Sequence, residues 1–193
     1  MGPKAQQARE RIVEAADTLF YTQGFENTSF ADIADAVQIS RGNFYYHFKT
    51  KDDILNAVID KRLAKTGDML QTWETQGNTP VENIRCFIHM MYENQSNIQR
   101  YGCPVGTLCT ELAKLNHASK QEANKLFALF RHWLTGQFTL LGKDEAHAQA
   151  LAMHLLARSQ GIATLSNAFQ DKAFIQLEVK QMDDWLAEQI QQT

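Results

Sequence analysis

Residues 28–51 of the chain read TSFADIADAVQISRGNFYYHFKTK, and this stretch predicts two short helices joined by a tight turn. The first helix opens at Ser29, which together with Asp32 three positions later has the pattern of a capping box. The second follows Ser40, a residue type favoured at the N-cap, and is rich in polar and aromatic side chains. Two short helices with a tight turn between them are typical of a helix-turn-helix.

The charge of this stretch differs from that of the whole chain. The 193 residues contain 19 Lys+Arg and 22 Asp+Glu, and the formal net charge of -3 alone argues against a partner that is a polyanion. Residues 36–51, in contrast, hold Arg41, Lys49 and Lys51 and no Asp or Glu. Basic and hydroxyl groups suit phosphates, and the side chains of Arg41 and Asn43 carry groups that bind base edges. The local composition therefore favours DNA as the partner.

The rest of the chain predicts further helices. Only 3 Pro and 10 Gly interrupt it, and the stretches between them are rich in good helix formers. Beyond the two short helices, apolar residues at steps of three and four predict helices at about 5–23, 52–75, 80–98, 108–115, 119–141, 144–169 and 171–191. We expect an all-α fold of about nine helices, with a three-helix DNA-binding domain at 1–51 and a larger helical domain at 52–193.

The last expected helix carries two apolar stripes. One contains Ile175, Val179, Met182, Leu186 and Ile190, and the other contains Phe174, Leu177 and Trp185. One stripe can face the core of its own chain, and a second copy of the chain is the natural partner of the other. We therefore expect a homodimer formed through the last two helices.

The string Phe44-Tyr45-Tyr46-His47-Phe48-Lys49-Thr50-Lys51 carries a family resemblance. With Gly24-Phe25, Thr28, Ile33-Ala34 and Ile39-Ser40 upstream, it resembles the N-terminal pattern of the tetracycline-repressor (TetR) family of bacterial transcriptional regulators. The match covers about residues 10–55, and the remaining chain is similar only in length, helix count and architecture. The resemblance implies a homodimeric repressor that binds a palindromic operator, with effector binding and dimerisation in residues 52–193 and a small-molecule effector that relieves repression.

Site residues follow from the same resemblance, position by position. It implies that Thr28, Tyr45 and Lys51 bind phosphates, and that Arg41, Gly42, Asn43, Tyr46 and His47 lie in or beside the major groove, next to Ser40 at the helix start. The periodicity of Phe44 and Phe48 instead predicts burial in the core.

The turn before Ile39 departs from the family pattern. This chain has Gln38 where the family commonly has Gly. If Gln38 adopts a left-handed backbone, the strain costs about 1 kcal/mol, because its Cβ crowds the following carbonyl. The turn would then aim the second helix differently.

Candidate effector contacts are aromatic, methionine and polar side chains of the larger domain, because ligand sites between helices are mainly apolar with a few polar groups. The set is Trp73, Phe87, Met91, Phe130, Trp133 and Arg158, with His132 and Tyr92 as further polar candidates. For the apolar members, ordinary core packing is the alternative.

The cysteines indicate neither a disulfide framework nor a metal site. Cys86, Cys103 and Cys109 lack CxxC spacing, and Cys86 with His89 has no third ligand nearby, so we expect no metal and no cofactor. Cys103 stands before Pro104 at an expected helix start, where a thiol becomes more reactive. Cysteine-based sensing of oxidants and electrophiles is known in the TetR family, and a packed small residue is the alternative.

Other function classes have less support. The sequence has no Gly-rich phosphate loop, no GxSxG and no HExxH, so we do not expect an enzyme. No run of about 18 apolar residues occurs and the first twenty residues hold no apolar leader segment, so we expect a cytoplasmic protein without a membrane partner. Two alternatives stay open: a cysteine-sensing repressor of the same fold, and a helical interaction module without DNA binding.

Overall fold

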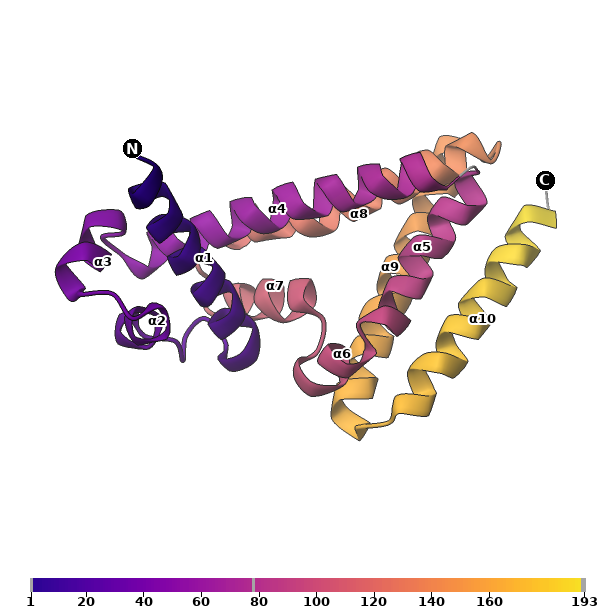
Figure 1. Cartoon of the computed structure of the whole chain (residues 1–193). Helices are drawn as coiled ribbons and strands as arrows, with labels where there is room; N and C mark the ends of the chain where they lie inside the picture. Colours follow the sequence, from indigo (N-terminus) through magenta and orange to yellow (C-terminus); the bar gives the residue numbers. More distant parts are fainter. Residues whose placement is uncertain (1, 78, 192–193) are drawn as a thin grey trace. The chain divides into compact units, whose positions relative to one another are not determined.

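A computed structural model describes residues 2–77 and 79–191, and for Arg41 and Lys172 the backbone only. This part of the chain contains ten α-helices and no β-strand, which confirms the all-α class (Figure 1). The helices are α1 (Pro3–Gln23), α2 (Phe30–Val37), α3 (Arg41–His47), α4 (Lys51–Gln76), α5 (Pro80–Glu93), α6 (Gln95–Tyr101), α7 (Pro104–Lys114), α8 (Lys120–Leu140), α9 (Glu145–Phe169) and α10 (Lys172–Gln191).

The additional helix comes from a break in the segment expected to be one helix at 80–98. Asn94 separates α5 from α6, with φ -99° and ψ 11°. Its side-chain amide donates a 2.8 Å hydrogen bond to the carbonyl of Met90. Such side-chain bonds compete with the helical hydrogen bonds of the backbone, which is why Asn favours helix ends.

The chain forms two compact units. Unit 1 comprises Met1–Ala64 and Thr107–Lys125, and unit 2 comprises Lys65–Gly106 and Leu126–Thr193. Each point of division lies inside a helix, namely α4, α7 or α8. The expected DNA-binding segment 1–51 thus belongs to a unit that also takes in most of α7. A functional boundary at residue 51 stays a prediction.

Unit 1 is built on the packing of α1 against α2. Ile12 and Phe20 on α1 and Ile33 on α2 are almost completely buried. Phe44 on α3 and Phe48 just after it are 1% and 3% exposed, so their predicted burial is confirmed. These side chains fix α3 to the core of the unit and leave its opposite face free.

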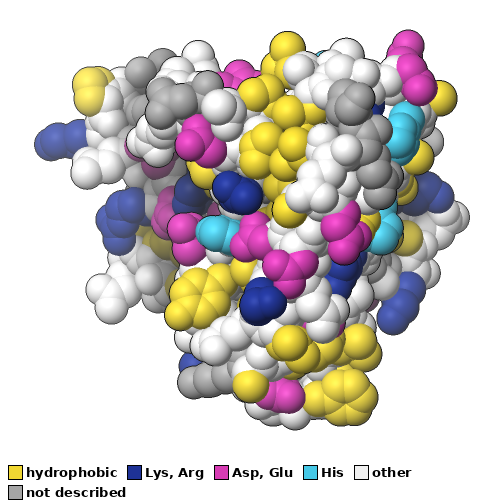
Figure 2. All heavy atoms as spheres, turned by 90° about the vertical axis from the view of Figure 1, so that its right-hand side faces the viewer, with side chains coloured by type: hydrophobic (Ala, Val, Ile, Leu, Met, Phe, Trp, Pro, Cys, Tyr) yellow, Lys and Arg dark blue, Asp and Glu magenta, His cyan; other side chains and the backbone are white. Residues whose placement is uncertain are grey.

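In unit 2, α10 packs against α5, α6 and α9. Of the first stripe of α10, Ile175, Val179, Met182 and Leu186 are buried. In the second stripe Leu177 is 54% exposed, whereas Phe174 and Trp185 are half-buried. Figure 2 faces the side that carries α10 and shows apolar patches between acidic and basic groups. In the described residues no helix combines the length and apolar character needed to cross a membrane.

Candidate nucleic-acid interface

The N-terminus of α2 is closed by the predicted capping box. The hydroxyl of Ser29 accepts the N–H of Asp32 at 3.2 Å, and the Asp32 carboxylate accepts the N–H of Ser29 at 2.7 Å. Hydrogen bonds to the Asp32 carboxylate, from the backbone N–H of Ser29 first and then from its hydroxyl, hold the pKa of this carboxyl below its ordinary value. Thr50 and Asp53 repeat the arrangement at the start of α4.

The turn between α2 and α3 has the strain expected at Gln38. Its φ of 53° and ψ of 47° lie in the left-handed region, so the condition stated for strain at a residue with a Cβ is met. Ser40 then begins α3, its hydroxyl accepting the N–H of Asn43 at 3.4 Å. Thus a capping residue and a left-handed residue set the direction in which α3 leaves the turn.

The outer face of α3 presents polar and aromatic groups. Tyr45 and Tyr46 are 48% and 64% exposed, and Gly42 and Asn43 are exposed beside them. Apart from its chain neighbours and the backbone of α3 itself, no heavy atom lies within 4 Å of the position that a Cβ on Gly42 would take. His47 is half-buried, and its Nδ1 is buried with no hydrogen-bond partner in the described part of the chain.

The side chain of Arg41 lies outside the described residues, so its expected base contact stays a prediction.

Lys51 stands at the first position of α4 with its ammonium held in place. Its Nζ donates to the carbonyls of Phe25 at 2.9 Å and Glu26 at 3.3 Å, and it lies 4.3 Å from the centroid of the Phe25 ring. An ammonium has three donors, so two of them bind the protein and a third has the capacity for another acceptor.

Thr28 does not have the environment expected of a phosphate contact. Its side chain is 0% exposed, and its hydroxyl donates to the carbonyl of Gly24 at 2.7 Å. Its backbone N–H donates to Phe25 at 3.3 Å. Because both donors are used inside the protein, we remove Thr28 from the candidate contacts and assign it to the structure of the turn.

Two family models match the chain. Residues 12–58 match the model described as bacterial regulatory proteins, tetR family. Residues 80–181 match the model described as transcriptional regulator LmrA/YxaF-like, C-terminal domain. The chain belongs to the TetR family. It is a DNA-binding transcriptional regulator, and TetR members bind operator DNA as dimers and respond to small-molecule effectors.

Individual relatives agree with this family. An uncharacterized HTH-type transcriptional regulator of Lactococcus lactis is 28% identical over 172 residues, which cover 84% of this chain and 85% of the relative. The HTH-type transcriptional regulator TtgR of Pseudomonas putida is 40% identical over 90 residues, or 47% of this chain and 42% of TtgR. A TetR transcriptional regulator structure from Legionella pneumophila is 25% identical with a TM-score of 0.82, covering 95% of this chain and 97% of that one.

Five of the six expected effector contacts of this TetR chain belong to or pack against one buried cluster of unit 2, and Arg158 does not; their role in effector binding stays a prediction. Phe87, Met91 and Phe130 are part of this buried core, as the alternative of core packing predicts. Arg158 lies on α9 and binds two residues of α10, with its Nη2 2.9 Å from the Glu178 carboxylate and 2.9 Å from the Gln181 side chain. It therefore ties two helices together.

The two tryptophans lie together in unit 2. The ring centroids of Trp73 and Trp133 are 5.5 Å apart. Trp133 is 9% exposed, and its indole N–H is buried with no acceptor among the described residues.

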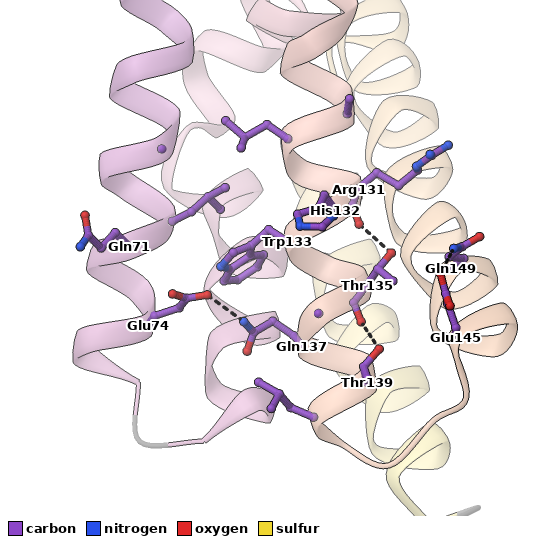
Figure 3. Close-up of a pocket in the computed structure, with 16 residues that line it drawn as sticks. Gln71, Glu74, Arg131, His132, Trp133, Thr135, Gln137, Thr139, Glu145 and Gln149 are labelled. Carbon is purple, nitrogen blue, oxygen red and sulfur yellow. Dashed lines mark hydrogen bonds between the residues drawn. The ribbon is translucent and has the colours of Figure 1, made fainter.

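Trp133 lines a pocket of about 1050 Å³ between α4, α8 and the start of α9 (Figure 3). The pocket also includes His132. Figure 3 shows the nitrogen-bearing edge of Trp133 turned towards the side of Glu74. The amide of Gln137 donates to Glu74 at 3.1 Å and accepts from Asn83 at 2.9 Å.

The sequence reasoning missed the polar side chains of this pocket. Glu74 and Gln137 are 63 residues apart in the chain, so no local spacing links them. Thr135 and Thr139 on α8 are spaced four apart, but each hydroxyl donates to the carbonyl four residues earlier, as in an ordinary helix.

Cys103 lies at the start of α7, as expected. Its sulfur accepts the N–H of Gly106 at 3.4 Å and an amide N–H of Gln160 at 3.5 Å. At Cys86, burial and then the charge of Glu93 raise the pKa of the thiol. In the described residues no group of three or more His, Cys, Asp or Glu side chains is arranged to hold a metal ion.

Proposed function

We propose that this TetR-family protein is a cytoplasmic repressor that binds a palindromic operator as a homodimer and is released by a small-molecule effector. The observation that carries the proposal is the exposed polar and aromatic face of α3, fixed by the Ser40 cap and by buried Phe44. Two copies of α3 would enter successive major grooves about 34 Å apart, or a multiple of that distance.

Within the operator complex, we assign two kinds of contact. Tyr45 and Lys51 bind phosphates, because one is exposed and the other has its ammonium fixed at the start of α4. The residues assigned to the major groove or its edge are Ser40, Arg41, Gly42, Asn43, Tyr46 and His47. Phosphate contacts fix the register of the protein, and contacts to base edges supply specificity.

Footprinting of the DNA upstream of the gene and its neighbours tests DNA binding and supplies the operator. On that operator, Lys51→Ala is expected to weaken binding and to reduce the slope of log affinity against log salt by about 1.8, because each of the two subunits loses one phosphate contact worth about 0.9. Lys125→Ala is the matched control, because Lys125 is an exposed lysine of the same unit that pairs with Glu122. An unchanged slope for Lys51→Ala would contradict the assignment, and the absence of any footprint would favour an interaction module.

For the dimer, the support is the exposed apolar surface of α9 and α10. Met153, Leu165 and Phe169 on α9 and Leu177 on α10 are 43–74% exposed. We expect Leu177→Asp to shift sedimentation from dimer to monomer, because the charge would be buried between copies. Leu115→Asp is the control, since Leu115 is 41% exposed in unit 1. Equal dimer fractions for both variants would contradict an interface through α10.

For the effector, we propose the pocket of Figure 3. Its buried, unpaired indole N–H suits a ligand with a hydrogen-bond acceptor, because pairing removes the desolvation cost of that donor. A compound that quenches tryptophan fluorescence and releases the operator is expected to lose most of its affinity in Trp133→Phe. Full retention of affinity would place the effector elsewhere.

Covalent modification of Cys103 is a second candidate route to release. The sulfur holds the N–H groups of Gly106 and Gln160, so an adduct would break two contacts at the start of α7. With N-ethylmaleimide, the sulfur adds to the alkene, a C–S bond forms and the thiol proton passes to the adjacent carbon. Operator release by this reagent in the native chain but not in Cys103→Ser would support the route, and equal release in both would contradict it.

A further inference from the structure

The turn between α1 and α2 is held by a residue distant in sequence. Glu111 on α7 accepts the backbone N–H of Phe25 with Oε2 at 2.9 Å and that of Glu26 with Oε1 at 2.9 Å. Each carboxylate oxygen thus accepts one donor, an arrangement that only a carboxylate offers at this position. Glu111, Phe25 and Glu26 all belong to unit 1.

The same peptide group is bound at its other end by Lys51. The peptide between Phe25 and Glu26 contributes the N–H bonded to Glu111 and the carbonyl bonded to the ammonium of Lys51. A negative charge at the N–H and a positive charge at the carbonyl polarise the peptide in the same direction, so each bond strengthens the other. The position of the Lys51 ammonium therefore depends on the bond that Glu111 makes.

Gly24 makes this approach possible. Its φ is +91°, and a Cβ at that position would stand 3.0 Å from Oε1 of Glu111. A side chain would therefore meet both backbone strain and a crowded carboxylate. The buried hydroxyl of Thr28 binds the carbonyl of Gly24 and closes the turn on its remaining side.

The residues that follow Glu111 add further contacts to this region. The ring of His117 packs edge-on against Phe25 with centroids 5.1 Å apart, and its Nε2 is 3.4 Å from Asp52. The hydroxyl of Ser119 donates to Asn56 at 2.9 Å. Segment 107–125, which lies within the match to the C-terminal domain model, thus packs on the turn and on the start of α4.

We infer that Glu111 is a positioning residue for DNA binding: by holding the Phe25–Glu26 peptide, it fixes the ammonium of Lys51 where that group meets a phosphate. This inference rests on the proposed function, because it takes Lys51 as a phosphate contact. It extends the DNA-binding machinery beyond residues 1–51 to α7. Residues Pro104–Gly106 at the start of α7 belong to unit 2, whereas Glu111 on the same helix belongs to unit 1. One helix thus carries both a segment of unit 2 and the residue that holds the Phe25–Glu26 peptide.

The test is a double-mutant cycle on the full-length protein, with operator affinity measured by fluorescence anisotropy across a salt series. Glu111→Gln is nearly isosteric, but its NH₂ would face one of the two N–H donors. We expect it to weaken binding about tenfold and to lower the salt slope towards that of Lys51→Ala. In the Lys51→Ala background, Glu111→Gln should change affinity by less than about twofold, because the residue acts through Lys51.

The matched control is Glu122→Gln, which removes the same charge from an exposed site in the same unit. It should leave affinity and slope unchanged. If circular dichroism shows that Glu111→Gln has lost helix, Glu111→Asp takes its place with the same expectations, because its shorter side chain cannot reach both N–H groups.

Three outcomes separate the possibilities. If Lys51→Ala loses slope and the Glu111 variant does not, the inference is overturned and the proposed function stands. If the Glu111 variant loses affinity at unchanged slope, and the loss adds to that of Lys51→Ala, Glu111 serves stability alone and the inference is again overturned. If the native chain gives no salt-dependent binding to any footprinted DNA, the proposed function itself fails.

Discussion

The α1–α2 turn of unit 1 and the pocket beside Trp133 in unit 2 differ in whether their buried polar groups have hydrogen-bond partners. In the turn, the buried hydroxyl of Thr28 and the peptide between Phe25 and Glu26 all have partners. Beside the pocket, the indole N–H of Trp133 and the Oδ1 of Asn83 are buried with no partner among the described residues. These groups of the turn thus carry no uncompensated desolvation cost, whereas the indole N–H of Trp133 does, and an acceptor on the proposed effector would remove that cost.

The largest effect should come from the core under the DNA-binding face. Phe44 is 1% exposed and fills the space beneath α3. Phe44→Ala should lower the free energy of unfolding by about 3–5 kcal/mol and abolish operator binding, because α3 loses its attachment to the unit. Urea denaturation at fixed protein concentration and a mobility-shift titration measure the two effects.

The counterpart in unit 2 is Phe87→Ala, which removes an equally buried ring from the other core. It should cost a similar free energy, but at temperatures where the variant is folded it should retain operator affinity. Loss of DNA binding in both variants to the same degree would break the comparison between the two units.

A smaller change in the free energy of unfolding should follow from removing a single hydrogen-bond donor, and it should depend on whether that donor has a partner. Thr28→Val keeps the shape of the side chain and deletes a hydroxyl that is bonded to Gly24, so unfolding should become easier by about 1 kcal/mol. Trp133→Phe deletes a donor that has no partner, and the relief offsets part of the packing lost with the smaller ring. We expect it to cost much less than Trp133→Ala, for which about 3–5 kcal/mol is typical.

Urea denaturation of the three variants measures these differences. If Trp133→Phe costs as much as Trp133→Ala, the indole N–H has a partner, and the contrast between the turn and the pocket disappears.

These two regions also differ in how much of them the sequence predicts. The Ser29–Asp32 capping box, the Ser40 cap and the buried Phe44 follow from spacings of three or four residues, which local physics sets. The resemblance to the TetR pattern marks Gln38 as the place where a left-handed backbone would be strained, and the structure has that backbone there. Glu111 bonds Glu26 across 85 residues, and no local pattern links two such positions.

The contrast between local spacings and contacts across the fold also explains where the sequence-based predictions and the structure differ. Thr28 looks like a phosphate contact in the motif, but its burial depends on how the turn folds over it. The ion pair of Arg158 with Glu178 on the next helix likewise depends on the fold and not on a local spacing. The break at Asn94 was missed because the apolar spacing continues through it, while the competing bond to Met90 is a side-chain property.

The turn before α3 offers a smaller and more specific test. Gln38→Gly removes the strain of a left-handed residue with a Cβ and should stabilise the protein by up to about 1 kcal/mol. If the strained turn aims α3, operator affinity should change as well. Thermal unfolding and anisotropy measure the two quantities.

Gln170→Gly is the control in unit 2, where Gln170 ends α9 with a φ of 55°. It should gain less stability, because the Gln170 side chain also donates to the carbonyls of Gln99 and Asn167, and it should leave operator affinity unchanged. A gain at Gln170 that equals the gain at Gln38 would mean that those two hydrogen bonds contribute nothing.

The smallest effect should be the pH dependence of the two caps in unit 1. Hydrogen bonds with Ser29 lower the folded-state pKa of Asp32, and those with Thr50 lower that of Asp53. A carboxyl whose pKa is lower in the folded state contributes stability above its unfolded pKa and loses it as the pH falls through the folded value. Asp32→Asn should therefore lower the melting temperature near neutral pH, and the difference from the native chain should shrink as the solution is acidified.

Asp35→Asn is the matched control, because it removes a charge from the same helix without removing a cap. Its difference from the native chain should vary less over the same acid range. If the melting temperatures of both variants approach that of the native chain equally as the pH falls, the pH dependence comes from the net charge of unit 1. If only the melting temperature of Asp32→Asn converges with that of the native chain, the carboxylate at the start of α2 stabilises the helix, as the bond that it accepts from the backbone N–H of Ser29 indicates.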